Sequence, residues 1–395
     1  MAAGVPNLPA PLFVNDSDGL DPNLILADMI AAFEAAAART LQPAQVERLL
    51  INLYAYRESL VRDAIQYAGQ QNLLAFASFP MIDYLGALLG VTRLGAVGAS
   101  VTLQFTLVNP LSVQYTIFAG TLVGTNDGQI SFATDSELII PAGSTQGSVS
   151  ATATTAGTSG NGYLAGQVNV LLNPSAQIAS VTNTDVSSGG SAPETDDHYR
   201  TRIQAAPNQF SVAGPSSAYR FFALGADPSI IDVQVLSSAP GTVDVYVLTG
   251  PVSVQPAAGP NPGGVASASL LQKVQAILSA DSVRPLTDTV NVNPVTEVDY
   301  QIAATISLYT DADPAATMAA ANAAAVQFAL NQAGRIGRDV VASQIVSALS
   351  VPGVYQVSVT APVAGQGVLS MSSAPGLWAN CTAISLTQAT SAEHS

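Results

Sequence analysis

Apolar and polar positions follow three successive patterns along the chain. Up to about residue 92, apolar side chains recur every three or four positions, which predicts helices at 24–39, 44–70 and 73–89. From Ala99 the period changes to two, and turn residues such as Asn109-Pro110 separate the short segments. This second pattern predicts an antiparallel β-sandwich or small barrel, with strands at 101–107, 114–117, 121–124, 130–133, 137–140 and 147–154.

Beyond residue 189, helical and strand patterns alternate. They predict two small α+β domains, with the ferredoxin-like fold as one candidate arrangement. The expected helices are 195–206, 216–223, 266–280, 314–333 and 340–349. The expected strands are 231–236, 243–248, 289–292, 298–309, 354–360 and 382–386, and a Pro- and Gly-rich loop occupies 251–265.

These patterns predict a multidomain α+β protein. Its expected parts are an extended arm at 1–20, a helical region at 21–92, a β-rich domain at 93–188, an α+β domain at 189–296, and a C-terminal α+β domain with a polar tail at 297–395. Asp21 followed by Pro22 is typical of a helix start, with Asp21 as the N-cap.

The predicted helix at 44–70 has the clearest periodicity in the chain. Its apolar face has two interpretations: it packs against the two flanking helices, or it forms a bundle shared with helices of partner proteins. The second interpretation is favoured because the helical region has little hydrophobic mass of its own. The residues expected to face a partner are Val46, Leu49, Leu50, Leu53, Leu60 and Val61.

Gly189 and Gly190 precede a helix start that carries Asp196 and Asp197, followed by Arg200. Acidic residues at a helix N-terminus interact favourably with the helix dipole. The composition also changes here, from Thr- and Ser-rich strands to alternating helices and strands. Gly189 and Gly190 are therefore predicted to form a hinge between two kinds of domain.

The chain has few charged residues, and most of them are acidic. Only 10% of the 395 residues are charged, and the net charge is −15 with a single lysine, Lys273. Such a surface repels phosphate backbones, so nucleic-acid binding is not expected. The low charge has two explanations that composition leaves open: other chains cover much of the surface, or the composition is biased towards alanine. No apolar run approaches a membrane span and no signal peptide is evident, so membrane insertion is not expected.

Candidate chemistry is weak throughout. His198 lies beside Asp196 and Asp197, but adjacent helical residues do not face each other and His394 is the only other histidine, so no metal site is predicted. Cys381 is the only cysteine, which excludes an internal disulfide and predicts a buried thiol. No catalytic residue and no cofactor are expected.

Several other positions have simple structural interpretations. Asp83 and Asp227 are expected in capping or turn roles. The loop from Gly334 to Asp339 follows a helix, not a strand, so it lacks the context of a phosphate-binding loop. Gly334 is therefore predicted to end one helix and Asp339 to cap the next.

A series of local patterns nevertheless appears in a characteristic order. They are Asp83-Tyr84-Leu85-Gly86 with Thr92-Arg93, Pro141-Ala142-Gly143, Gly160-Asn161-Gly162, Thr182-Asn183, Glu194-Thr195-Asp196 with Tyr199-Arg200-Thr201-Arg202, Ala226-Asp227-Pro228, Pro240-Gly241-Thr242, Arg284-Pro285-Leu286-Thr287-Asp288 and Gly337-Arg338-Asp339. Together these patterns resemble the Baseplate J-like family of contractile phage tails and related injection machines.

The resemblance implies a structural, non-enzymatic component of the baseplate wedge. Paired copies would join a smaller wedge protein through a helical core bundle, and neighbouring C-terminal domains would close a six-fold ring around the hub. It also implies contacts with sheath-initiator and hub proteins, relay of the contraction trigger to the sheath, assembly in the host cytoplasm, and a final place in the virion tail. The near absence of lysine departs from the family.

The sequence is also compatible with a second class of function. The Thr-, Ser- and Gly-rich strands and the scattered carboxylates are also compatible with a β-rich carbohydrate-binding or carbohydrate-active surface protein.

Overall fold

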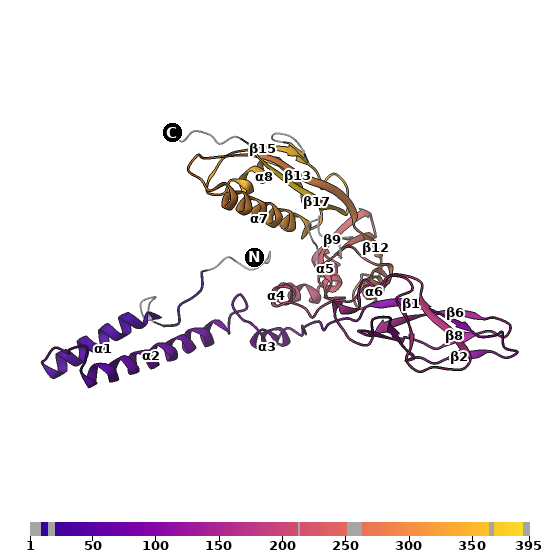
Figure 1. Ribbon diagram of the computed structural model, residues 1–395, viewed down its shortest axis with the longest axis horizontal. Helices are drawn as coiled ribbons and strands as arrows, with labels where there is room; N and C mark the ends of the chain where they lie inside the picture. The colour runs from indigo at the N-terminus through magenta and orange to yellow at the C-terminus, as the bar shows by residue number, and fades with distance from the viewer. Residues whose placement is uncertain (1–8, 15–19, 212–213, 251–262, 363–366, 390–395) are drawn as a thin grey trace. The chain divides into compact units, whose positions relative to one another are not determined.

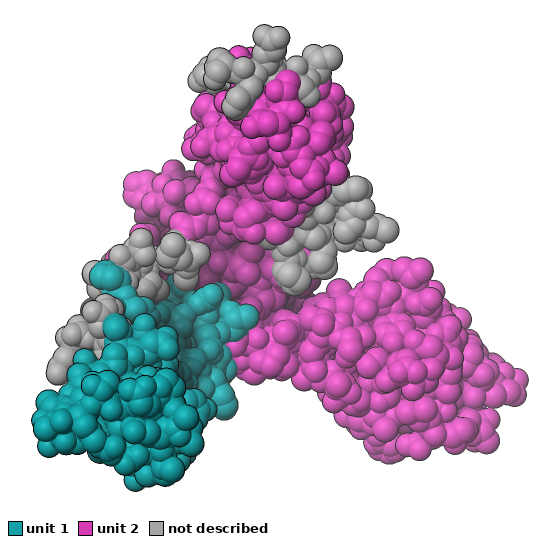
Figure 2. All heavy atoms as spheres, turned by 60° about the vertical axis from the view of Figure 1, so that its left-hand side comes forward, with its two compact units in different colours: residues 1–93, 195–206 teal, residues 94–194, 207–395 magenta. Residues whose placement is uncertain are grey.

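A computed structural model describes residues 9–14, 20–211, 214–250, 263–362 and 367–389 (Figure 1). Most of the predicted arm, most of the 251–265 loop, and the polar tail with His394 lie outside these residues. By its contacts the chain divides into two compact units, Met1–Arg93 with Thr195–Ala206, and Leu94–Glu194 with Pro207–Ser395 (Figure 2). The chain therefore passes between the units three times, at 93/94, 194/195 and 206/207. The predicted five-part division stays a prediction.

The first unit is helical, as expected. Asp21 accepts a hydrogen bond from the Asn23 N–H at 2.8 Å, and Pro22 is the first helical residue, which confirms the predicted helix start. The third helix is shorter than predicted, because residues 71–80 form turns that end at Pro80. Proline disfavours helical backbone in the residue before it. The helices are α1 (Pro22–Ala37), α2 (Val46–Gln70), α3 (Met81–Ala87) and α4 (Asp196–Ala205).

The β-rich domain is a nearly closed antiparallel barrel. Its six-stranded sheet has the order β7-β3-β4-β6-β1-β8, and β2 pairs separately with β5. Asn183 helps to close the barrel, because its side chain accepts the Val168 N–H at 2.9 Å and donates to the Leu164 carbonyl at 2.9 Å. The strands are β1 (Ser100–Leu107), β2 (Tyr115–Ile117), β3 (Leu122–Thr125), β4 (Ser131–Thr134), β5 (Leu138–Ile140), β6 (Gln146–Ala153), β7 (Val168–Leu171) and β8 (Ile178–Asn183).

Two α+β domains follow, as predicted. The central domain contains α5 (Ser216–Leu224), β9 (Ile230–Ala239), β10 (Thr242–Thr249), β11 (Gly264–Val265), α6 (Ala268–Leu278) and β12 (Thr289–Pro294). The C-terminal domain contains β13 (Thr296–Leu308), α7 (Pro314–Ala333), β14 (Val340–Val341), α8 (Ala342–Leu349), β15 (Val354–Ala361), β16 (Val368–Leu369) and β17 (Leu377–Gln388). Over the described residues, neither domain has the β-α-β-β-α-β order of the ferredoxin-like fold.

The central and C-terminal domains share a core. Only Val295 separates β12 from β13, and these strands pair in parallel with β10 and β17 respectively. Trp378 of β17 is fully buried in a cluster with Leu248 and Val295, and its indole N–H donates to the Ala333 carbonyl at 2.7 Å. The two domains therefore contribute side chains to one buried cluster at the short connection between them.

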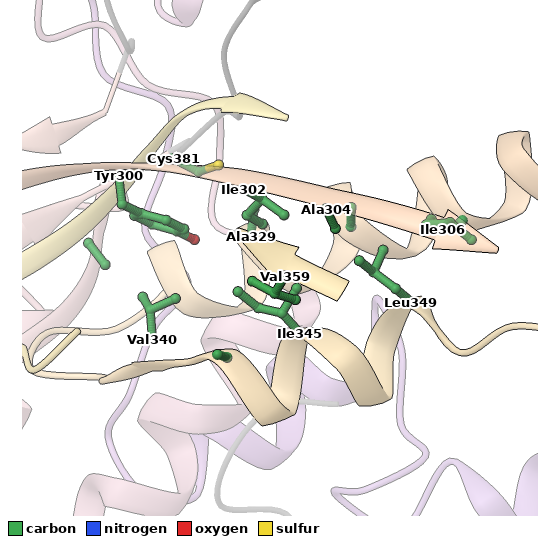
Figure 3. Packing of buried hydrophobic residues seen from close by; sticks show 14 of the residues in the cluster. Tyr300, Ile302, Ala304, Ile306, Ala329, Val340, Ile345, Leu349, Val359 and Cys381 are labelled. Atoms are coloured by element: carbon green, nitrogen blue, oxygen red, sulfur yellow. The ribbon is translucent and has the colours of Figure 1, made fainter. Parts of the chain in front are cut away.

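The C-terminal core lies between the three-stranded sheet and two helices. Ile302, Ala304 and Ile306 alternate along β13 and point towards Ala329 of α7 and towards α8 (Figure 3). Cys381 is buried in the same cluster, as predicted, and this burial raises the pKa of its thiol. Both helices of the domain, α7 and α8, therefore pack against the same face of the sheet.

The predicted role of Asp339 is wrong. Helix α8 begins at Ala342, because Val340 and Val341 form β14 and pair with β16. Asp339 instead accepts the N–H groups of Met371 and Ser372 at 2.6 and 2.9 Å, so it holds the turn before β17. Gly334 does follow the last residue of α7, as predicted.

Candidate functional site

Helix α2 exposes a wide apolar face. All six residues predicted to face a partner are exposed, from 43% for Leu60 to 69% for Val46. Tyr54, Tyr56 and Ile65 are also at least half exposed. At 3.6 residues per turn, these positions cover about half of the helix circumference. A face this wide has room for more than one partner helix.

The opposite face of α2 is small or polar, and it is occupied by the chain itself. Its buried residues are Ala55, Ser59 and Gln66, and α1 packs beside α2. The Gln66 side chain accepts the Phe13 N–H and donates to the Pro11 carbonyl, both at 2.8 Å. Among the described residues, internal packing therefore accounts for the small side chains of α2 and leaves its leucines exposed.

An ion-paired cluster joins α4 to the segment around α3. The Arg93 guanidinium contacts Asp83 of α3 and Asp196 of α4, each at 2.7 Å, and lies 4.8 Å from the centre of the Tyr199 ring. Burial alone would lower the pKa of Arg93, but hydrogen bonds to Asp83 and Asp196 outweigh it and raise that pKa. Arg93 thus stays charged and bridges two carboxylates that come from distant parts of the sequence.

The other residues of α4 bind backbone groups around α3. The buried Tyr199 hydroxyl donates to the Val91 carbonyl at 2.7 Å. Arg200 donates to the carbonyls of Leu74 and Ala77 at 2.7 and 2.8 Å, which satisfies the turns before α3. A Cβ atom at Gly86 would overlap the Tyr199 hydroxyl, so glycine is required for this close approach. Together these contacts fix α4 to the first unit.

Asp83 therefore has an ion-pair role that its predicted capping role did not include. Sequence reasoning identified the 83–93 and 194–202 motifs separately and did not place them together. The available signal was complementary charge: the 194–202 motif holds three acidic residues and only two arginines, so it has a carboxylate to spare for Arg93 of the other motif. Asp227 does have the predicted turn role, since it accepts the Ser229 N–H at 3.0 Å, and it also pairs with Lys273 at 2.9 Å.

Gly189 and Gly190 lie where the chain leaves the barrel. Gly190 exchanges two hydrogen bonds with the Asn161 side chain, both at 2.8 Å. Nearby, the Leu94 N–H donates to the Glu194 carboxylate at 2.9 Å, and the Glu194 N–H donates to the Leu94 carbonyl at 3.0 Å. The two ends of the barrel segment are thus held together. The hinge at Gly189 and Gly190 concerns motion and stays a prediction.

Other candidate sites have structural roles. The Ile336 N–H donates to Asp232 and the Gly337 N–H to the Leu377 carbonyl, so this loop uses its amides within the fold. Over the described ranges, no group of three or more His, Cys, Asp or Glu residues is placed to hold a metal ion. Within the same ranges, no helix combines the length and the apolar character needed to cross a bilayer.

The barrel carboxylates bind neighbouring hydroxyls. Asp127 accepts from Thr125 at 2.5 Å, and Asp135 accepts from Ser150 at 2.7 Å. The hydrogen bond from Thr125, followed by that from the Gln129 N–H, lowers the pKa of Asp127. A glycosidase acid needs the opposite shift, so Asp127 is poorly suited to that role.

Comparison with known proteins covers most of the chain. Residues 47–99 match the Baseplate J-like N-terminal domain, 102–190 the Baseplate J-like protein barrel domain, 211–294 the central domain and 300–387 the C-terminal domain. Baseplate protein J of Escherichia phage P2 is 37% identical over 171 residues, which are 43% of this chain and 53% of that protein. The match therefore spans about half the length of that relative.

A solved structure of the anti-feeding prophage baseplate is also similar. The TM-score is 0.41 and the sequence identity 17%, over 90% of each chain. The family assignment itself depends on the four successive domain matches, which occur in the order expected from the sequence motifs. The chain belongs to the Baseplate J-like family of structural proteins of phage tail baseplates.

Proposed function

We propose that this chain is a structural component of the baseplate wedge of a contractile phage tail or related injection device. Its α2 face would join a helical bundle with a smaller wedge protein and a second copy of the chain. The leucines of α2 carry this proposal, because they form an apolar surface that the described part of the chain leaves exposed. The assembled protein would reside in the virion tail after assembly in the host cytoplasm.

We also propose a mechanical role without enzymatic activity. The assembled copies would form a six-fold ring around the hub, contact sheath-initiator and hub proteins, and relay the contraction trigger to the sheath. The ion-paired cluster supports this role, because α4 is fixed to α3 while the chain continues from both ends of α4 into the second unit. A displacement of the helical bundle would thus pass to the barrel and to the central domain through three covalent connections.

Co-purification with candidate tail proteins tests the proposal. The wild-type chain should form a higher-order complex, and the double change Leu53→Asp and Leu60→Asp should abolish capture of the helical partner. Leu286→Asp is the matched control, because Leu286 is 92% exposed and lies outside α2. A wild-type chain that remains a lone monomer with every candidate contradicts the proposal.

The carbohydrate alternative is tested separately. Depolymerisation of a host polysaccharide by the wild-type chain, lost on Asp127→Asn or Asp135→Asn, would replace the structural role by an enzymatic one.

A further inference from the structure

The C-terminal sheet has two open edges. Its strand order is β15-β13-β17, and no further strand of the described chain pairs with the outer side of β15 or of β17. Strand β17 runs over 12 residues and β15 over 8. Helices α7 and α8 pack on one face of this sheet. Open edges present unpaired backbone N–H and C=O groups that can bind another strand.

The composition of the two edge strands favours such pairing. Proteins usually protect an open edge with charged residues or proline. The sequences of β15 and β17 contain no Lys, Arg, Asp, Glu or Pro. The chain has a net charge of −15, so two copies repel each other. A contact surface without carboxylates adds least to this repulsion. The uncharged edges are therefore suited to contact between copies.

The backbone of β17 is oriented for this contact. The Ala389 N–H donates to the Ile306 carbonyl of β13 at 2.8 Å. Backbone groups alternate in direction along a strand, so Leu386 and Gln388 direct theirs away from β13. These groups lie beyond the buried start of β17, in the part where Gln388 is exposed.

We propose that the outer edge of β17 in one copy pairs with the outer edge of β15 in a second copy, antiparallel. Strand β15 is antiparallel to β13, and β13 is parallel to β17. A second sheet in the same orientation therefore brings its β15 antiparallel to β17 and continues the strand order. Such a head-to-tail contact uses two different surfaces, so it can repeat from copy to copy and close a ring.

This inference rests on the proposed function only in taking a second copy as the partner. The structure also identifies side chains that can be used to detect the pairing of β17 with β15. Thr305 pairs with Ser358 and with Thr387, and its hydroxyl lies 3.2 Å from that of Thr387. Ser358 and Thr387 are exposed on this same sheet face, one on each edge strand.

Cysteine cross-linking tests the pairing in the full chain. Copies carrying Thr387→Cys or Ser385→Cys are mixed with copies carrying Ser358→Cys or Thr360→Cys and then oxidised. Mixed dimers are expected, with little product when Ser307→Cys on the central strand replaces the β15 variant. The native Cys381 is buried and is present in every variant, so any cross-linking through it is the same background in all samples. Dimers of Thr387→Cys alone, or yields equal to the Ser307→Cys control, overturn the proposal.

A charge placed on the edge provides a second measurement. Ser385→Lys should cause loss of the mixed dimer, whereas Ser307→Lys, on the same face of the central strand, should leave it unchanged. Thermal melting verifies that both variants are folded. The α2 double variant should lose partner capture but keep the edge cross-link, which distinguishes failure of the bundle from failure of the edge pairing. Equal losses for Ser385→Lys and Ser307→Lys contradict edge pairing.

Discussion

Helices α2 and α7 solve opposite packing problems with similar periodicity. Helix α7 buries small residues, including Ala321, Ala325 and Ala329, against the C-terminal sheet. Helix α2 also buries small or polar residues, but it holds its leucines on the exposed side. This difference shows that an apolar stripe on a helix identifies a packing face, but not whether the packing partner belongs to the same chain or to another one. In α7 the contact is internal, whereas in α2 the large side chains are exposed and their contact with another chain is a proposal.

The largest expected effect is on the buried face of α7. Ala329→Asp should lower the free energy of unfolding by about 4 kcal/mol or more, because Ala329 is fully buried and an unpaired carboxylate there is costly. Urea denaturation measures the change. Ala323→Asp, on the exposed side of the same helix, is the control and should have a small effect. Equal effects would show that the assigned internal face is wrong.

A smaller effect is expected at the cluster that holds α4. Arg93→Met should lower the free energy of unfolding of the first unit by about 1 kcal/mol, since Asp83 and Asp196 remain partly hydrated. Hydrogen exchange of the α4 amides at low and high salt measures it. The exposed Arg57→Met in α2 is the control. Unchanged exchange in the Arg93 variant would mean that packing of Tyr199 alone fixes α4.

A pH effect is expected in the domain that contains α7. Backbone hydrogen bonding from Ser372, with further bonds from Met371 and Ser370, lowers the pKa of Asp339. The carboxylate therefore stabilises the fold above the ordinary aspartate pKa of about 4, and this contribution is lost as pH falls through the lowered value. Melting temperatures at pH 6 and pH 3 should differ less for Asp339→Asn than for the wild type. An identical pH dependence would exclude this role.

The smallest expected effect on stability is at the outward face of α2. Leu53→Gln with Leu60→Gln should change the free energy of unfolding by less than about 0.5 kcal/mol per site, because both side chains are exposed in the free chain. Urea denaturation of the chain alone is the measurement. A loss of several kcal/mol would assign these leucines to the protein's own core and remove the contrast with α7.

Much of the fold could be predicted from the local periodicity of apolar residues. The bounds of α7 were predicted to the residue, and the six α2 positions predicted to face a partner are all exposed. Strands β7 and β8 were missed, since neither shows a clean alternation; β7, for example, leaves both Asn169 and Val170 exposed. The cluster around Arg93 was also missed, because its members are separated by about a hundred residues and become neighbours only through tertiary folding.

The pair of hydrogen bonds between Leu94 and Glu194 has a consequence for how such proteins diversify. Because the two ends of the barrel segment meet, the barrel is an insertion within the helical unit, not a link in a linear series. An inserted module of this kind can change its length, loops or surface while its host keeps the same spacing at the point of insertion. A change in the length or surface of the barrel would therefore leave the contacts between α3 and α4 on either side of it in place.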